Sequence, residues 1–252
     1  DGVVARVVLA APKANILDRE MVTALEGIFT ELSSRSDLRA IVIEAEGPHF
    51  SYGASIQEHL PDQIGAALER LSNLLRKIAA APAPTIAAVR GQCLGGGLEL
   101  VLACDLIVAE ENAHFGVPEI KLGVFPPAAS ALLPVRLGLA RATEIVLTGR
   151  TWAAKESHSK ELVARLAPDG SLGEELSSWI ETEFVPRSPV ALRFAVRAIR
   201  ERVVQALEEV LPRLDRMYIE EMMPLGDAEE GIRAFLEKRP AAWSKKEEEA
   251  AV

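Results

Sequence analysis

Apolar residues follow two alternating patterns along the first 110 positions of the chain, and this alternation predicts an α/β core. Compact apolar runs of strand length occupy residues 3–10, 38–45, 85–89 and 105–109, and apolar residues at helical spacing occupy residues 18–32 and 63–80. Asp18 stands where its side chain can cap the first of these helices. Strands that alternate with helices are typical of α/β domains.

The pattern becomes wholly helical after about residue 186. Ser188 followed by Pro189 is a helix-start signal, and the periodicity predicts a long helix over residues 190–211 that Pro212 bends or breaks. A final helix is expected to start at Asp227, with Glu230 completing a capping box, and to end near residues 238–240. We therefore expect a site-bearing core over residues 1–186 and a helical region over residues 187–252, which could also pack on a neighbouring subunit.

Composition and charge narrow the possible partners. The chain has 252 residues, 49% of them apolar, and a net charge of −9 without a basic stripe, which argues against nucleic acid as a partner. Cys93 and Cys104 match no metal or redox spacing and are expected to be small buried groups in a reducing compartment. We expect no membrane span and no signal peptide, hence a cytoplasmic location.

None of the four histidines is spaced to hold a metal. His49, His59, His114 and His158 are therefore interpreted as structural or surface residues, and no metal is expected.

The glycine-rich run of residues 91–97, followed by Glu99, is the strongest chemical signal. Glycines allow close backbone approach, and a helix start presents free N–H groups, so this turn can hold a developing oxyanion beside an acid or base. For an isolated Glu99, the simpler interpretation is an acid that compensates the helix dipole. The preceding glycines favour the functional interpretation.

Two further segments could complete such a site. Glu119 follows 20 residues after Glu99, and two acids beside a donor pocket can divide general acid and base work. Residues 47–55 follow a strand and could supply a second backbone donor. Taken alone, Glu119 would be an exposed loop acid and residues 47–55 a plain strand-to-helix turn.

In this order along the chain, these motifs resemble the crotonase (enoyl-CoA hydratase/isomerase) superfamily. The matching segments are residues 11–14, 49–56, 91–99, 115–123, 147–150 and 230–243. The resemblance implies a spiral of ββα units with a helical C-terminal region, assembled as a homotrimer or a dimer of trimers. It also implies an acyl-CoA thioester substrate and no further cofactor, since CoA is part of the substrate.

The resemblance also assigns roles to individual residues. Ala54 and Gly96 match the oxyanion donors, and Glu99 and Glu119 match the two hydratase glutamates. Glu119 is the expected proton donor to carbon, although the two roles could be exchanged or shared. The expected substrate-binding residues are Lys13, Ala14, Ile16, Tyr52, Ser55, Ile56, Phe125, Pro126, Phe235 and Lys238.

Three departures from the usual family pattern bear on the acyl group. Ser55 replaces an acid, Asn15 comes one place early, and a proline-containing segment over residues 124–130 replaces a glycine-rich one. That segment stiffens the pocket wall and, with Tyr52 and Phe125, suggests a flat, rigid acyl group.

These details resemble a branch of the family that hydrates a cyclic conjugated dienoyl-CoA in anaerobic benzoyl-CoA breakdown. The alternatives are an ordinary 2-enoyl-CoA hydratase, another crotonase such as an isomerase or a ring-opening hydrolase, and a non-catalytic CoA- or RNA-binding scaffold.

Overall fold

Two sheets form the centre of the fold, which is described by a computed structural model over residues 2–12, 14–156 and 162–244. The main sheet is parallel and has the strand order β1-β2-β3-β5-β8, and a smaller sheet has the order β4-β6-β7. The strands are β1 (Val4–Leu9), β2 (Ala40–Ala45), β3 (Thr85–Val89), β4 (Gln92–Leu94), β5 (Leu106–Glu110), β6 (His114–Gly116), β7 (Thr151–Ala153) and β8 (Arg165–Ala167).

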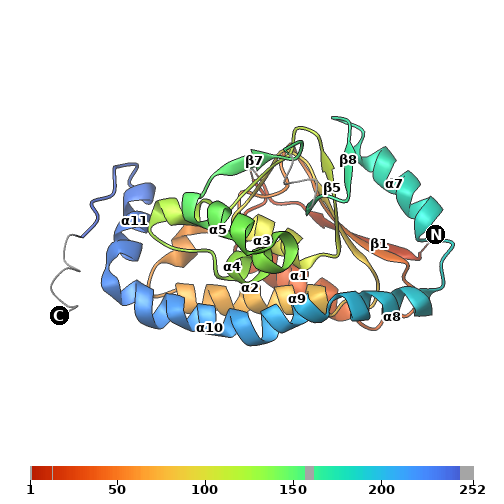
Figure 1. The fold of residues 1–252 in the computed structure, drawn as a ribbon, viewed down its shortest axis with the longest axis horizontal. Helices are drawn as coiled ribbons and strands as arrows, with labels where there is room; N and C mark the ends of the chain where they lie inside the picture. The colour runs from red at the N-terminus through yellow and green to blue at the C-terminus, as the bar shows by residue number, and fades with distance from the viewer. Residues whose placement is uncertain (1, 13, 157–161, 245–252) are drawn as a thin grey trace.

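Most helices lie below the strands in Figure 1 and extend the molecule to the left. The α-helices are α1 (Arg19–Leu32), α2 (Ile64–Ala79), α3 (Gly96–Ala103), α4 (Pro127–Leu137), α5 (Leu139–Thr148), α7 (Leu172–Glu183), α8 (Pro189–Ile199), α9 (Glu201–Gln205), α10 (Leu211–Arg216) and α11 (Asp227–Leu236). Short 3-10 helices span Ile56–His59, Pro118–Leu122 and Met223–Leu225, and π-helical turns span Ala206–Val210 and Met217–Met222.

The repeating unit is a strand in each sheet followed by a helix. β3 leads directly into β4 and then α3, and β5 leads into β6 and then, through the 3-10 helix Pro118–Leu122, into α4. In each unit, the helix therefore begins close to the point where the two strands end. The α/β class and the ββα arrangement expected from the sequence are confirmed.

The main sheet is buried on both faces because successive residues of each strand point to opposite sides. In β2, Ile41 and Ile43 join the main core, whereas Ala40 and Val42 pack in a second cluster under α7. This two-sided burial explains why the strands read as continuous apolar runs rather than alternating ones.

Local signals for helix starts are confirmed at two positions. Asp18 accepts a hydrogen bond from the N–H of Met21 at 2.9 Å and caps α1. Ser188 accepts one from the N–H of Ala191 at 3.3 Å and caps α8, with Pro189 in the first helical position.

The helical run continues past Pro212, so the predicted break was wrong, and the alternative, a bend, stays a prediction. The chain remains helical from Glu201 to Leu225, with the π-helical turn Ala206–Val210 directly before α10. In that turn the N–H of Leu211 donates to the carbonyl of Ala206. In a π-helical turn, each hydrogen bond spans five residues instead of four. The regular four-residue bonds that a proline would disrupt are therefore absent at this point.

The predicted capping box at the last helix was also wrong. Gly226 occupies the cap position of α11, and no side chain caps the helix. Glu230 instead accepts hydrogen bonds from both terminal nitrogens of Arg239, at 2.6 and 2.8 Å. A guanidinium partner offers a charged, two-point contact that a backbone N–H does not.

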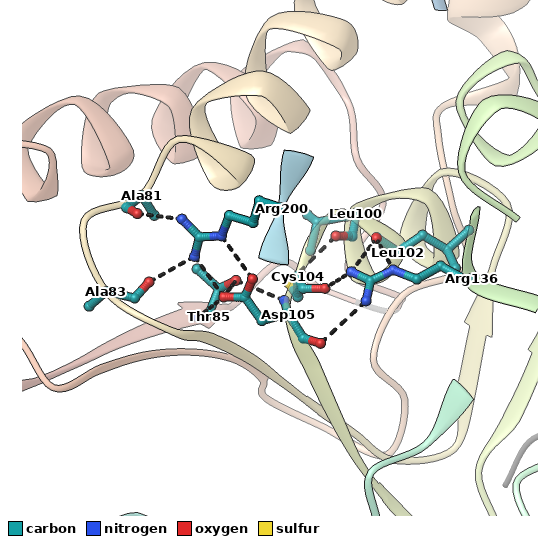
Figure 2. A network of polar contacts seen from close by, with 9 residues as sticks. All are labelled: Ala81, Ala83, Thr85, Leu100, Leu102, Cys104, Asp105, Arg136 and Arg200. Carbon is teal, nitrogen blue, oxygen red and sulfur yellow. Dashed lines mark hydrogen bonds and ion pairs between the residues drawn. The ribbon is translucent and has the colours of Figure 1, made fainter. Parts of the chain in front are cut away.

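A buried ion pair fastens the C-terminal helices to the main sheet (Figure 2). Arg200, at the junction of α8 and α9, donates to both carboxylate oxygens of Asp105 at 2.8 and 2.6 Å, and also to the carbonyl of Ala83. Asp105 in turn accepts from the backbone and hydroxyl of Thr85. The network joins the starts of β3 and β5 to the C-terminal helical run.

Residues of this run also complete the main core. Val203, Ala206, Leu207 and Leu211 belong to the same buried cluster as the sheet residues. The division at residue 186 and the association with another subunit stay predictions. Cys93 and Cys104 are buried and unpaired, as expected. Within the described part of the chain, every helix is too short or too polar to cross a bilayer.

Candidate active site

Gly95, Gly96 and Gly97, at the start of α3, each approach another segment too closely for a side chain. Gly95 has a φ of +51°, and a Cβ there would lie 2.6 Å from Oε1 of Glu119. A Cβ on Gly97 would lie 2.7 Å from the Cβ of Ser51. A side chain at Gly95 or Gly97 would therefore collide with the neighbouring segments that contain Glu119 and Ser51.

The same turn brings two backbone donors together. A Cβ on Gly96 would lie 3.1 Å from the nitrogen of Ala54, and one on Gly53 would lie 3.3 Å from the nitrogen of Gly96. Gly96 opens α3, so its N–H has no partner within the helix. The backbone nitrogens of Ala54 and Gly96 thus lie close together, which an oxyanion pocket built from these two residues requires.

Glu99 lies in the first turn of α3 and is only 5% exposed. Its Oε1 accepts a hydrogen bond of 2.9 Å from the N–H of Ala129, near the start of α4. Burial raises its pKa, and the nearby charge of Asp215 adds to this rise, whereas the hydrogen bonds from Ala129 and Ala128 oppose it.

Glu119 reaches the glycine turn from the 3-10 helix Pro118–Leu122. The residue is partly exposed, but its Oε2 is fully covered and has no hydrogen-bond partner among the described residues. Burial of the carboxyl group raises its pKa, and the charge of Glu99 raises it further. Two carboxyls that disfavour each other's charge tend to share one proton, which leaves one as a base and the other as an acid.

One pocket collects most of the predicted site residues. Its lining includes the predicted residues Tyr52, Ala54, Ser55, Ile56, Gly96, Glu99, Glu119, Phe125 and Pro126. They come from the segment before the helix Ile56–His59, the glycine turn, the Glu119 helix and the start of α4. Pro126 and Pro127 form the cap and the first position of α4, so the stiff wall expected from the sequence is also the start of a helix.

The remaining predicted substrate-binding residues lie away from this pocket. Ala14 lines a separate hollow with Pro12, Asn15 and His49, and Ile16 is partly exposed beside Leu17, which does line the main pocket. Phe235 and Lys238 lie exposed at the end of α11. Lys13 lies outside the described residues.

Two polar residues from the C-terminal helices were missed from the sequence. Tyr218 lines the pocket and is 1% exposed, while its hydroxyl has no hydrogen-bond partner among the described residues. Asp215, one helical turn earlier, accepts from the hydroxyl of Ser72 at 2.9 Å, and burial raises its pKa to about 6. Both occur in an ordinary helical pattern, and no local signal separates them from surface residues.

The polar wall formed by the helix Ile56–His59 and α2 was missed as well. Glu58 pairs with Arg70 at 2.6 Å, and both line the pocket. His59, interpreted from the sequence as structural, also lines it, and its Nδ1 lies 2.8 Å from the carbonyl of Ser55.

The other histidines lie elsewhere. His49 accepts from the N–H of Gln92, His114 contacts the carbonyl of Asn112, and His158 lies outside the described residues. Across residues 2–12, 14–156 and 162–244, no group of three or more His, Cys, Asp or Glu side chains is placed to hold a metal ion.

Comparison with known proteins agrees with this geometry. Residues 1–246 match the Enoyl-CoA hydratase/isomerase family. The chain belongs to this family. The resemblance to the crotonase superfamily is thereby confirmed.

Individual relatives cover nearly the whole chain. Over 243 residues it is 45% identical to the cyclohexa-1,5-dienecarbonyl-CoA hydratase of Thauera aromatica, covering 96% of this chain and 93% of that protein. A probable enoyl-CoA hydratase of Bacillus subtilis is 34% identical over 244 residues, covering 95% and 94%.

A solved structure gives the same result for the fold. The crystal structure of an enoyl-CoA hydratase from Mycobacterium avium subsp. paratuberculosis K-10 superimposes with a TM-score of 0.85 at 26% identity, covering 97% of this chain and 96% of that one.

Proposed function

We propose that this protein is an acyl-CoA hydratase whose substrate is a cyclic conjugated dienoyl-CoA. The reaction is the conversion of cyclohexa-1,5-diene-1-carbonyl-CoA to 6-hydroxycyclohex-1-ene-1-carbonyl-CoA in anaerobic benzoyl-CoA degradation. The observation that carries the hydratase chemistry is the convergence of Glu99 and Glu119 on one pocket, beside the paired N–H groups of Ala54 and Gly96.

The thioester oxygen is bound by the two N–H groups. As water attacks the β-carbon, electrons move onto that oxygen, and preorganised donors stabilise the resulting charge. Removing one such donor typically costs about 3–4 kcal/mol of transition-state stabilisation. Because both donors are backbone groups, their positions depend on the close approach of the glycine turn to residues 53–54.

The carboxyl pair binds the water and takes its proton. Their raised pKa values keep a proton on the pair near neutral pH, so one carboxyl acts as base while the other can act as acid. The division of these roles between Glu99 and Glu119 stays open in this proposal.

Two observations support the cyclic substrate over an open-chain one. The relative with 45% identity is named for the cyclic diene, and it covers nearly the whole chain. The stiff wall of Phe125, Pro126 and Pro127 lines the same pocket as the glycine turn, which suits a flat ring.

Turnover of crotonyl-CoA and of the cyclic dienoyl-CoA, compared side by side, tests the substrate. We expect a kcat/KM at least about tenfold higher for the cyclic diene, which corresponds to about 1.4 kcal/mol of differential transition-state binding. A strong preference for crotonyl-CoA would instead identify an ordinary 2-enoyl-CoA hydratase.

A second measurement tests the carboxyl pair. Glu119→Gln should lower hydration by about 10²–10⁴-fold, the usual contribution of general acid–base catalysis. Near-normal hydration by this variant would refute the assignment. Binding of RNA at physiological salt, with no hydration of any acyl-CoA, would favour the scaffold alternative.

The remaining assignments are proposals of the same kind. Lys13, Ala14 and Ile16 contact the CoA portion, and Phe235 and Lys238 reach the CoA of a neighbouring subunit in a trimer or dimer of trimers. CoA is part of the substrate, and no additional cofactor takes part. Crosslinking and sedimentation of the protein, with and without acyl-CoA, test the assembly.

A further inference from the structure

Tyr218 lines the pocket and carries a hydroxyl that the proposed reaction has not yet used. The side chain is 1% exposed, and the oxygen is fully covered with no hydrogen-bond partner among the described residues. A buried tyrosine hydroxyl normally has a partner, because leaving it unpaired costs free energy. Since Tyr218 lines the same pocket as the carboxyl pair, the missing partner is expected to be part of the substrate.

The ring of Tyr218 is held firmly in place. It packs 5.5 Å from the ring of Phe125, centroid to centroid, in an apolar cluster that includes Ile64, Leu68 and Val124. It lies in the π-helical turn Met217–Met222, between α10 and α11 (Figure 1). π-Turns of this kind are frequent at functional sites.

The hydroxyl also lies within electrostatic range of both carboxyls. Burial raises the pKa of Tyr218, and the charges of Glu119 and Glu99 raise it further. The phenol therefore keeps its proton at neutral pH.

The proposed reaction needs a proton donor away from the water. Water adds to the β-carbon of the ring, and the dienolate is then protonated at the far end of the diene, on the opposite corner of the ring. An ordinary enoyl-CoA takes both parts of water on adjacent carbons, whereas here the carbon that takes the proton lies across the ring from the carbon that takes the hydroxyl. This separation favours a proton donor other than the carboxyls that hold the water. A catalytic donor has to lie within hydrogen-bond reach of the atom that it protonates.

Resting on the proposed function, we propose that Tyr218 donates this proton. The carboxyl pair takes a proton from water as the C–O bond forms and electrons move to the thioester oxygen. The carbonyl then re-forms, the double bond shifts, and the far carbon takes the proton from Tyr218. The resulting phenolate is reprotonated by the carboxyl pair, so the net change is the addition of one water.

Tyr218→Phe tests the proposal, because phenylalanine keeps the ring packing. We expect kcat for the cyclic diene to fall about 10²–10³-fold with KM changed less than about threefold. Crotonyl-CoA hydration, which needs no remote donor, should change less than about threefold. Unaltered circular dichroism and thermal unfolding would verify the fold.

The chain contains only one other tyrosine, Tyr52, which provides a matched control. Tyr52→Phe keeps the ring that shapes the pocket and removes only a hydroxyl on a residue that is 44% exposed, so any loss should be similar for the two substrates. An equal loss on both substrates in Tyr218→Phe, or no loss on the diene, would overturn the proposal. Wild-type protein that fails to hydrate the diene would overturn the proposed function itself.

A change in the acidity of the phenol separates proton donation from a purely structural role. In a Tyr52→Phe background, biosynthetic replacement of tyrosine by 3-fluorotyrosine alters position 218 alone. Its more acidic phenol is a better proton donor and should raise kcat for the diene relative to kcat for crotonyl-CoA. An unchanged ratio of the two kcat values would also overturn the proposal.

Discussion

Replacing Glu119 with glutamine should make the protein more stable at alkaline pH while removing its activity. The carboxyl group of Glu119 is buried, its Oε2 has no hydrogen-bond partner among the described residues, and Glu99 lies nearby. All three conditions disfavour the charged form in the folded protein. Glutamine keeps the shape and removes the charge.

The sign follows from the direction of the pKa shift. The folded state raises the pKa of Glu119 above its ordinary value of 4.5. The group therefore favours folding at pH below that value, and this contribution is lost as pH rises through the folded pKa. Each unit of displacement corresponds to about 1.4 kcal/mol, or a shift in Tm of about 3–5 °C for a chain of this size.

Thermal unfolding at about pH 5 and about pH 9 measures the effect. The difference in Tm between Glu119→Gln and wild type should be small at the lower pH and should favour the variant at the higher one. Glu31→Gln, on the exposed face of α1, removes the same charge and controls for net charge. A variant that is no more stable than wild type at alkaline pH, or one that only matches the Glu31 control, would refute the reasoning.

Three further changes test other parts of the structure. Asp215→Asn should move the acidic limb of the kcat pH profile to lower pH, because the charge of Asp215 raises the pKa of Glu99. Gly95→Ala should lower kcat about 10²-fold, because the new methyl group would lie 2.6 Å from Oε1 of Glu119; Gly27→Ala, with open space around it, is the matched control. Arg200→Met should lower the free energy of unfolding, measured in urea, by about 3–5 kcal/mol, because it leaves a buried carboxylate unpaired.

Elements with short-range causes could be predicted from the sequence. The strand at residues 85–89 was predicted with the bounds that the structure gives, since a buried apolar run between Pro84 and Arg90 has few alternatives. The caps at Asp18 and Ser188 depend on contacts three residues away and were also predicted. The glycine turn with Glu99 was found because one short segment contains both the backbone approach and the acid.

Choices between competing partners could not be predicted. Glu230 has the right spacing for a capping box but bonds to Arg239, which only the fold of the last residues brings near. Pro212 has the usual properties of a helix breaker, yet a π-helical turn lets the helix pass. In both cases, a rule based on neighbouring residues failed, because a distant contact or an unusual backbone turn was more favourable.

The sequence by itself determined most of the strand and helix pattern and the positions of the glycine turn, Glu99 and Glu119. Only the tertiary structure decided that Tyr218 and Asp215 lie near Glu99 and Glu119, and that burial raises the pKa of both glutamates. The physical reason is that backbone propensity and capping act over a few residues, whereas desolvation and charge coupling depend on which distant segments exclude water together. The acid–base character of this pocket is therefore a property of its packing, and the residues that create it are spread from Ala54 to Tyr218.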